Sequence, residues 1–441
     1  MKRALPEGRL ARAGVAGKAA VKVGLGHLGH GLKRPFLSPA RQAEERAALD
    51  EQHARVLFEA LTQLRGTALK AAQMLAMEVE LLPEAYRREL EKSCHQVPPL
   101  NRVLVRKALQ EAFGQPPEAL FAQFESEAFA AASLGQVHRA RLHDGRPVAV
   151  KIQYPGIHVA IDSDMTLLRQ LARGLPNAAL IQQSLEEIHA RLREEVDYRA
   201  EAAHTAWFAE HAARAGIALV SPVPALCGQR VLTTEMAAGQ HLDAWLAGQP
   251  SQAARDRAGQ LLYDFFVDST RRLHRLHADP NPGNYLFHAD GALTVIDFGC
   301  VREISPRFAE TLPQLLHAYA ADDPAALFAA YERLGMQHHG DHQQVYHDIL
   351  RPFGAWLLKP MQGENYDFAA NRDYTWRGQQ LMHKMSGLKG LDRLADEFIY
   401  FDRTFYGLCK LFERLGARVR MRHHWFAGQG GTLVQRTGDL P

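Results

Sequence analysis

The 441-residue sequence contains only four cysteines, and their positions exclude the structures that cysteines most often build. Cys94, Cys227, Cys300 and Cys409 lie far apart, and none forms a C-x-x-C pair. Disulfide frameworks and zinc ribbons need cysteines at close, regular spacing. We therefore expect reduced thiols in a cytosol-like compartment.

The sequence also lacks a large excess of charge of either sign. Its formal net charge is +3 and its pI is about 8.6, so a broad nucleic-acid-binding surface is not indicated. The basic residues are unevenly placed, because the first 34 positions hold eight lysines and arginines and a single acidic residue, Glu7. We expect residues 1–49 to form a flexible basic leader, with a contact to an anionic membrane or an organelle address as alternatives.

No apolar run is long and uninterrupted enough to read as a membrane-spanning helix. A bilayer would then be contacted from the side. The expected location is the cytoplasm, with peripheral attachment to the inner membrane as the alternative. A hydrophobic content of 46% is enough for one large core or two lobes.

The periodicity of apolar residues predicts an α+β protein in which a strand-rich region is followed by a larger helical one. Apolar residues in steps of three and four predict a helix within 50–77, and Gly114 is a plausible end for a helix over 101–114. Further helices are predicted at 157–174, 181–214 and 251–276, strands at 127–133, 137–142, 147–153, 217–220, 230–236, 285–288 and 293–296, and helix throughout from about 303. This order is the layout of a bilobal protein-kinase-like fold with a helical preface.

One short stretch carries the arrangement of a phosphoryl-transfer site. Asp279 is followed five residues later by Asn284, and Asp297 then opens an Asp-Phe-Gly sequence. In kinase-like proteins such an Asp orients the attacking hydroxyl, while the Asn and the second Asp hold Mg²⁺ across the phosphates. Oxygen donors of this kind favour Mg²⁺ over zinc. His277 precedes the loop and is more often structural than a metal ligand at this position.

A candidate nucleotide lysine lies upstream. Lys151 ends the apolar stretch Val-Ala-Val-Lys, and a lysine in a core-facing strand needs a compensating partner such as a phosphate or a carboxylate. Where a protein kinase has a glycine-rich loop, this chain has three alanines followed by Ser133, Leu134 and Gly135. Alanine restricts positive φ, so we expect this loop to hold a nucleotide in a different pose or more stiffly.

Together these motifs resemble the UbiB family of atypical kinases, also called the AarF or ADCK family. The resemblance rests on Ala-Ala-Ala-Ser-x-Gly-Gln-Val-His, the Val-Ala-x-Lys strand and His-Ala-Asp-Pro-x-Pro-Gly-Asn, and it covers about residues 60 to 300. Two further matches are Lys70 to Gln73, which resembles the family's K-x-G-Q motif, and Glu195 to Asp197, which resembles its E-x-D motif. Two departures are Ala72, where the family has glycine, and Asn281, where it has histidine.

The resemblance implies a domain order and a set of functional residues. It implies a helical extension over 50–117 that packs over the active site, an N-lobe over 118–236 and a C-lobe over 237–441. Catalytic roles fall to Asp279, Lys151, Lys70 and Gln73, and metal binding to Asn284 and Asp297. Supporting ion pairs would involve Glu195 with Lys70, Glu201 with Lys151, and Asp197. On a regular helix Glu195 and Asp197 point about 200° apart, so they can share one partner only if the helix breaks there. The implied nucleotide contacts are Ala131, Ala132, Ser133, Gly135, Gln136, Val137, Lys151, Glu235 and Met236.

The implied function is an ATPase or atypical kinase that uses ATP and Mg²⁺ and supports ubiquinone biosynthesis. The implied partners are an anionic membrane surface, isoprenoid or quinone precursors, quinone-biosynthesis enzymes and a second copy of the chain, but not nucleic acid. Two alternatives stay open: a nucleotide-gated lipid-binding or scaffold protein, and a small-molecule phosphotransferase. The segment from Arg414 to His424 is expected to be an exposed basic helix face, with a membrane-surface role as its alternative.

Overall fold

The computed structural model describes residues 102–132, 134–172, 178–338, 341–386, 391–393 and 396–426, together with a few positions before residue 102, namely Arg41, Glu51, Gln52, Arg55, Val56, Thr67, Lys70 and Ala71. The chain divides into two compact units. Unit 1 comprises 1–200 and 223–234, and unit 2 comprises 201–222 and 235–441. Each unit is described below by itself. Most of the predicted helical extension, including its packing over the active site, lies outside the described residues.

Unit 1 contains a five-stranded sheet and a pair of long helices. The strands are β1 (Gln123–Phe124), β2 (Ala130–Ala132), β3 (Gly135–Arg141), β4 (Pro147–Gln153) and β6 (Val231–Glu235), with the order β1-β3-β4-β6 and β2 paired with β3. Strands β1, β2 and β4 are antiparallel to β3. The helices are α5 (Arg102–Phe113), α6 (Pro117–Leu120), α7 (Ile157–Ala172) and α8 (Ala178–Glu195), and η2 (Pro224–Leu226) is a 3₁₀ turn.

The sheet of unit 1 has one apolar face, which packs on α5. On β4, Val148, Val150 and Ile152 are buried and alternate with Ala149 and Lys151. Because successive side chains of a strand point to opposite faces, the three apolar residues share one side and Lys151 lies on the other. The apolar side joins a cluster with Val105 and Leu109 of α5. The predicted hairpin turn is present, because Gly145 between β3 and β4 has φ +91°.

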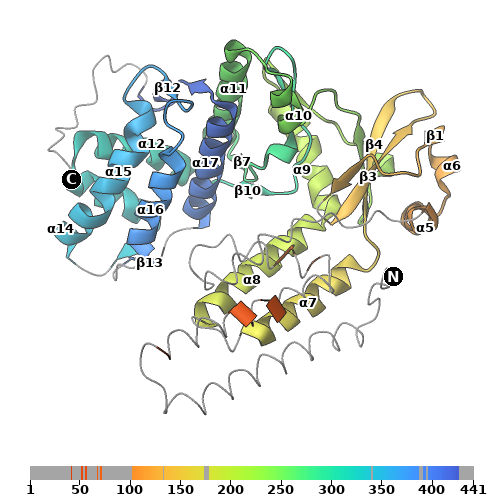
Figure 1. Ribbon diagram of the computed structural model, residues 1–441, viewed down its shortest axis with the longest axis horizontal. Coiled ribbons are helices and arrows are strands. Elements are labelled where there is room, and N and C mark those ends of the chain that lie inside the picture. The colour runs from red at the N-terminus through yellow and green to blue at the C-terminus, as the bar shows by residue number, and fades with distance from the viewer. Residues whose placement is uncertain are drawn as a thin grey trace. The chain divides into compact units, whose positions relative to one another are not determined.

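The two long helices of unit 1, α7 and α8, lie side by side (Figure 1). Each buries an apolar stripe; Ile161 and Met165 of α7 and Leu185 and Ile188 of α8 are 0–1% exposed. The helix predicted over 181–214 is not continuous. It ends at Glu195, and α9 (Tyr198–His211) begins three residues later, because Asp197 caps the new helix with its Oδ1, which accepts from the amide of Ala200 at 3.1 Å.

Unit 2 is mainly helical. Its helices are α10 (Leu242–Ala247), α11 (Gln252–Arg271), α12 (Pro306–Ala321), α13 (Pro324–Arg333), α14 (His342–Val345), α15 (Arg351–Leu358), α16 (Tyr374–Ser386) and α17 (Asp396–Leu415), with short turns η3 (Pro282–Asn284), η4 (Tyr346–Leu350), η5 (Lys359–Met361) and η6 (Arg422–His424). Its strands are β5 (Ile217–Leu219), β7 (Arg275–His277), β8 (Tyr285–Phe287), β9 (Leu293–Val295), β10 (Val301–Glu303), β11 (Gln337–His338), β12 (Tyr366–Asp367), β13 (Leu391–Arg393) and β14 (Arg418–Val419).

The core of unit 2 is centred on α11, which is buried along most of its length. Figure 1 shows α11 beside α17. Tyr263 and Phe266 of α11 pack with Phe412 and Phe401 of α17, at ring-centroid distances of 6.5 and 5.0 Å. Ser251 caps the start of α11, since its side chain accepts from the amide of Ala254.

Two sequence predictions for unit 2 are corrected by the structure. The helix predicted over 251–276 ends at Arg271, and residues 275–277 form β7, which pairs with β10. The region after 303 is not entirely helical, because β11 to β14 form two short two-stranded sheets. These strands are only two or three residues long, too short to produce a period-2 pattern. In the described part of the chain, every helix falls short of the length or the apolarity that a membrane span requires.

Candidate functional site

The loop from Asp279 to Asn284 in unit 2 is held in shape by its own polar side chains. The amide nitrogen Nδ2 of Asn284 donates to Oδ2 of Asp279 at 2.7 Å and to its carbonyl oxygen at 3.2 Å. Asn281 caps the following turn, because its Oδ1 accepts from the amide of Gly283 at 2.9 Å. Asn281, which stands where the UbiB family has histidine, therefore stabilises this loop.

Asp297 lies beside this loop at the end of β9. β9 pairs with β8, and the amide of Ile296 donates to the carbonyl of Asn284 at 3.0 Å. His277, which is buried, donates from Nε2 to the carbonyl of Asp297 at 2.8 Å. Burial raises the pKa of the Tyr285 phenol, and the carboxylates of Asp279 and Asp297 raise it further. Both carboxylates therefore lie near the phenol of Tyr285.

A helix distant in sequence closes against this loop. A Cβ on Gly407 of α17 would lie 2.3 Å from Cγ of Pro280, which follows Asp279 directly. Only a residue without a side chain allows that approach. Gly407 was not singled out by sequence reasoning, because a single glycine inside a helix pattern carries no signal of its own.

The Asp-Phe-Gly segment packs against α9 within unit 2. Phe298 is buried and stacks on Phe208, with ring centroids 4.7 Å apart, and His204 bonds the carbonyl of Phe298 at 3.3 Å. Glu201 is buried, and a Cβ on Gly299 would lie 3.7 Å from its Oε2. The predicted pairing of Glu201 with Lys151 stays a prediction, because the two residues belong to different units.

In unit 1, Lys151 lies opposite Val137 in the register of β3 and β4, and Gly135 lies opposite Gln153. Directly opposed residues of an antiparallel pair share a face, so Gly135, Val137 and Lys151 lie on the face turned away from α5. The ammonium of Lys151 lies 4.9 Å from the ring centroid of Tyr198, within the range of a cation–π contact.

Tyr198 is a residue that sequence reasoning missed. It is 1% exposed, and a Cβ on Gly135 would lie 3.1 Å from its hydroxyl oxygen and 2.4 Å from the carbonyl oxygen of Ile152. Gln153 fixes the same segment, because its Nε2 donates to the carbonyl of Val196 at 2.6 Å. The break between α8 and α9 therefore sits directly on β3 and β4. The sequence signal for Tyr198 is its position directly after Asp197, the last residue of the E-x-D match.

Gln136 lies on the opposite face of the sheet from Lys151. It is paired with the buried Ile152 in the register, is itself 1% exposed, and its Nε2 lies 2.7 Å from Nε2 of His138. Nδ1 of His138 lies 2.8 Å from the carbonyl of Glu125, to which it must donate. Nε2 of His138 is then the acceptor for Gln136. A nucleotide contact of Gln136 on the Lys151 face would have to come from its main chain.

Within unit 1, two polar pairs join Thr67 and Lys70 to the long helices α7 and α8. Lys70 donates to Oε1 of Glu195, and Thr67 donates to Oδ2 of the buried Asp164. Because α8 ends at Glu195, this carboxylate and that of Asp197 serve different partners, Lys70 and the start of α9. Among the residues that the structure describes, Asp197 forms no ion pair, and its supporting role stays a prediction.

For the remaining predicted residues, the structure gives a position in a strand or no description. Gln73 and Ser133 lie outside the described residues, as does Ala72. Ala131 and Ala132 form β2, with Ala131 opposite Gln136 and Ala132 opposite Gly135. Glu235 ends β6 and donates its amide to the carbonyl of Ser221, and Met236 follows it. The chain passes from unit 1 to unit 2 between residues 234 and 235, so Glu235 and Met236 are the first residues of unit 2 after this boundary.

The donor set of unit 2 fits Mg²⁺. Nδ2 of Asn284 donates two hydrogen bonds to Asp279, which turns the oxygen Oδ1 of Asn284 away from that residue. Asp297 directs Oδ1 to the amide of Gly299 at 2.9 Å, a turn that fixes the carboxylate. One carboxamide oxygen and one carboxylate are hard oxygen ligands, the kind Mg²⁺ takes when phosphates complete its shell.

The fold and these residues define a protein-kinase-like class of protein. Residues 89–330 match the ABC1 atypical kinase-like domain. The rat protein named atypical kinase COQ8B, mitochondrial, is 33% identical over 331 residues, which cover 73% of this chain and 62% of the rat protein. The protein named atypical kinase COQ8, mitochondrial, of Schizosaccharomyces pombe is 30% identical, over 95% of this chain and 69% of that protein.

A solved structure has a similar fold. The structure of Rv3197 with erythromycin from Mycobacterium tuberculosis matches with a TM-score of 0.59 and 26% identity, over 87% of this chain and 97% of that one. The chain belongs to the ABC1 atypical kinase family, which confirms the resemblance to UbiB proteins and the kinase-like α+β fold. It spans less than two thirds of the rat relative's length.

Proposed function

We propose that this protein binds Mg-ATP and hydrolyses it as an atypical kinase of UbiB type. The observation that carries the proposal is the bonded pair of Asp279 and Asn284 with Asp297 beside it, in a chain of the ABC1 family. A carboxylate oriented by an amide and a second carboxylate next to it is what positioning a nucleophile and a metal requires.

In the proposed reaction, Asp279 accepts the proton of the attacking water at the carboxylate oxygen that Asn284 does not occupy. Asn284 and Asp297 would hold Mg²⁺, which when bound neutralises charge on the phosphates. Lys151 would contact the phosphates with its ammonium, and Tyr198 and Gly135 support its strand. ATP, Mg²⁺ and the meeting of Lys151 with the unit 2 residues are parts of this proposal.

The biological setting that we propose is ubiquinone biosynthesis at a membrane. The two relatives above carry the name COQ8 and the word mitochondrial, which supports this setting. The proposed partners are an anionic membrane surface, isoprenoid or quinone precursors, enzymes of their biosynthesis and a second copy of the chain. Peripheral attachment to the membrane is the proposed mode of contact.

The test is ATP turnover by the purified chain, measured alone, with anionic lipid vesicles, with a phenolic quinone-precursor mimic, and with both. We expect Mg²⁺-dependent hydrolysis that rises with both additions. The absence of turnover in all four conditions would contradict the enzyme proposal. Nucleotide binding without turnover, and full cellular function of Asp279→Asn, would instead favour a nucleotide-gated scaffold.

A further inference from the structure

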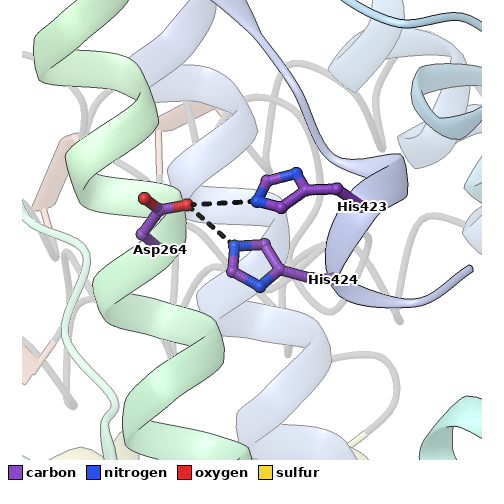
Figure 2. A group of neighbouring side chains, drawn as sticks. All are labelled: Asp264, His423 and His424. Atoms are coloured by element: carbon purple, nitrogen blue, oxygen red, sulfur yellow. Dashed lines mark hydrogen bonds and ion pairs between the residues drawn. The ribbon is translucent and has the colours of Figure 1, made fainter. Parts of the chain in front are cut away.

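A buried carboxylate and two adjacent imidazoles come together in unit 2, away from the loop that carries Asp279. Asp264 belongs to α11, and His423 and His424 belong to η6 (Figure 2). Oδ1 of Asp264 lies 2.7 Å from Nε2 of His424 and 4.0 Å from Nε2 of His423. One ligand atom from each residue lies within 4.8 Å of the others. Asp264 is 9% exposed, whereas His423 is exposed.

These distances are close to those of a metal site. Tetrahedral nitrogen and oxygen ligands of zinc bind at about 2.0–2.1 Å, so they lie roughly 3.3 Å from one another. The two measured separations fall on either side of that value. A rotation of the exposed His423 ring would shorten the longer one, and the ring of His424 would have to move back by less than 1 Å.

The segment that leads from α17 to the two histidines is held to α11 by hydrogen bonds that do not involve them. Residues spaced by four along α11 bond the segment that follows α17, so its position does not depend on the bond between His424 and Asp264. Gln252 donates to the carbonyl of Gly416 at 2.8 Å, Asp256 accepts the amide of Arg418 at 2.7 Å, and Gln260 accepts the amide of Arg420 at 2.8 Å. The side chains of the cluster are therefore presented by a rigid support, as a metal site requires.

The carboxylate of Asp264 is also oriented by hydrogen bonds from residues outside the cluster. Arg214 donates to its Oδ2 at 2.8 Å, and Gln260 donates to Oδ1 at 2.7 Å. Bonds of this kind from outer residues to a ligating carboxylate fix its direction and are usual around bound metals. Arg214 also pairs with Asp268, so two carboxylates share one guanidinium and the group carries net negative charge to receive a cation.

We propose that Asp264, His423 and His424 form a site for a divalent transition-metal ion of the zinc class. Two imidazoles and one carboxylate suit zinc, cobalt, nickel and copper, and not Mg²⁺, which prefers oxygen ligands. The exposed side of His423 gives the ion a path of entry and leaves a position for water. The ion would join η6 to α11, the helix that leads into β7 and the loop of Asp279. The site is independent of the proposed ATPase activity.

The test uses the full chain, freed of metal with a chelator that is then removed, and titrated with Co²⁺ in the absence of nucleotide. We expect one equivalent to give the visible absorption of a cobalt site with nitrogen ligands, and Zn²⁺ to displace it. Zn²⁺ should also raise the melting temperature of the wild-type protein, since a ligand that binds the native state stabilises it.

The informative variant is His423→Ala, because it removes a ligand and leaves the bond between His424 and Asp264 in place. We expect it to lose the cobalt spectrum and the zinc-dependent shift while keeping the wild-type melting temperature in chelator. The control is His241→Ala, which removes an exposed histidine that makes no side-chain cap at the start of α10. Asp297→Asn separates this site from the proposed Mg²⁺ site and should leave the cobalt spectrum unchanged.

Two outcomes would overturn the proposal. One is a wild-type protein without a cobalt spectrum at stoichiometric metal, which would leave the cluster as a hydrogen-bonded clamp. The other is a spectrum that survives in His423→Ala or disappears equally in His241→Ala or Asp297→Asn, which would place the ion elsewhere on the chain.

Discussion

The two units hold their functional residues in different ways. In unit 2, Asp279 bonds Asn284 five residues away, and both lie within twenty residues of Asp297. In unit 1, the pair of Lys70 and Glu195 spans 125 residues, and Thr67 reaches Asp164 across 97. A motif can therefore report the first group directly, whereas the second exists only once the helices have packed. The predictions below test how far this contrast holds.

The largest expected effect comes from breaking the short-range group. Asp279→Asn keeps the shape of the side chain but removes the group proposed to accept a proton. General-base removal typically costs about 100- to 10,000-fold in rate, so ATP turnover should fall by that range while nucleotide binding is kept. Steady-state hydrolysis and equilibrium nucleotide binding measure the two quantities. A variant that turns over ATP at the wild-type rate would remove Asp279 from the reaction.

A second variant tests whether the loop from Asp279 to Asn284 also depends on packing against a helix distant in sequence. Gly407→Ala places a methyl group 2.3 Å from Pro280 and must displace the loop or the helix. A shift of about 1 Å near a reacting group can cost on the order of 100-fold, so we expect a fall of about 10- to 100-fold in kcat.

The matched control is Gly363→Ala, because a Cβ there has its nearest contact at 3.7 Å. It should keep wild-type turnover. Equal losses in both variants would show that the contact of Gly407 with Pro280 does not position the loop.

A smaller effect is expected from the long-range pair of unit 1. The side chains of Lys70 and Glu195 are 24% and 29% exposed, so water screens them in part. Lys70→Ala should lower the free energy of unfolding by about 1 kcal/mol, measured by urea denaturation. Arg106→Ala is the control, since its pair with Glu118 is 51% and 68% exposed and should change stability by less than about 0.5 kcal/mol. A double-mutant cycle with Glu195→Ala that gives no coupling energy would mean that the pair does not contribute to the stability of unit 1.

The last effect concerns the pH dependence of stability and His138. Burial lowers the pKa of this imidazole, and the hydrogen bond to the carbonyl of Glu125 opposes that shift in part. Below about pH 6.5 the unfolded chain takes up a proton at this residue more readily than the folded chain does. Stability should therefore fall as the pH drops below about 6.5, by at most about 1.4 kcal/mol per pH unit from this one group.

Thermal unfolding between pH 7.5 and 5 measures this dependence. His138→Gln should flatten the decline, and His143→Gln, at an exposed position in the hairpin, should leave it as in the wild type. Identical curves for all three proteins would show that His138 takes up its proton in the folded state.

Sequence patterns predicted nearly the correct bounds for those elements of unit 1 whose apolar residues recur with a clear period. The strand predicted over 147–153 is β4, with the same bounds, and the helix over 157–174 is α7 within two residues. They failed where a cap or a short pair decided the structure. The break at Val196 depends on Asp197 capping α9, and the helix predicted to the end of the basic segment stops at Leu415, because the next residues pair as β14 with β12.

By itself, the sequence determined the kinase-like order of elements and the identity of the residues around Asp279, because local spacing sets which side chains a single loop can present. Only the tertiary structure decided that Tyr198 lies against Lys151, that Gln136 faces away from it, and that His423 and His424 reach Asp264. Those contacts join residues up to 160 positions apart, and no local preference fixes such pairs. They form when apolar faces are buried together, since that burial, and not the spacing of the polar residues, brings the chain segments into contact.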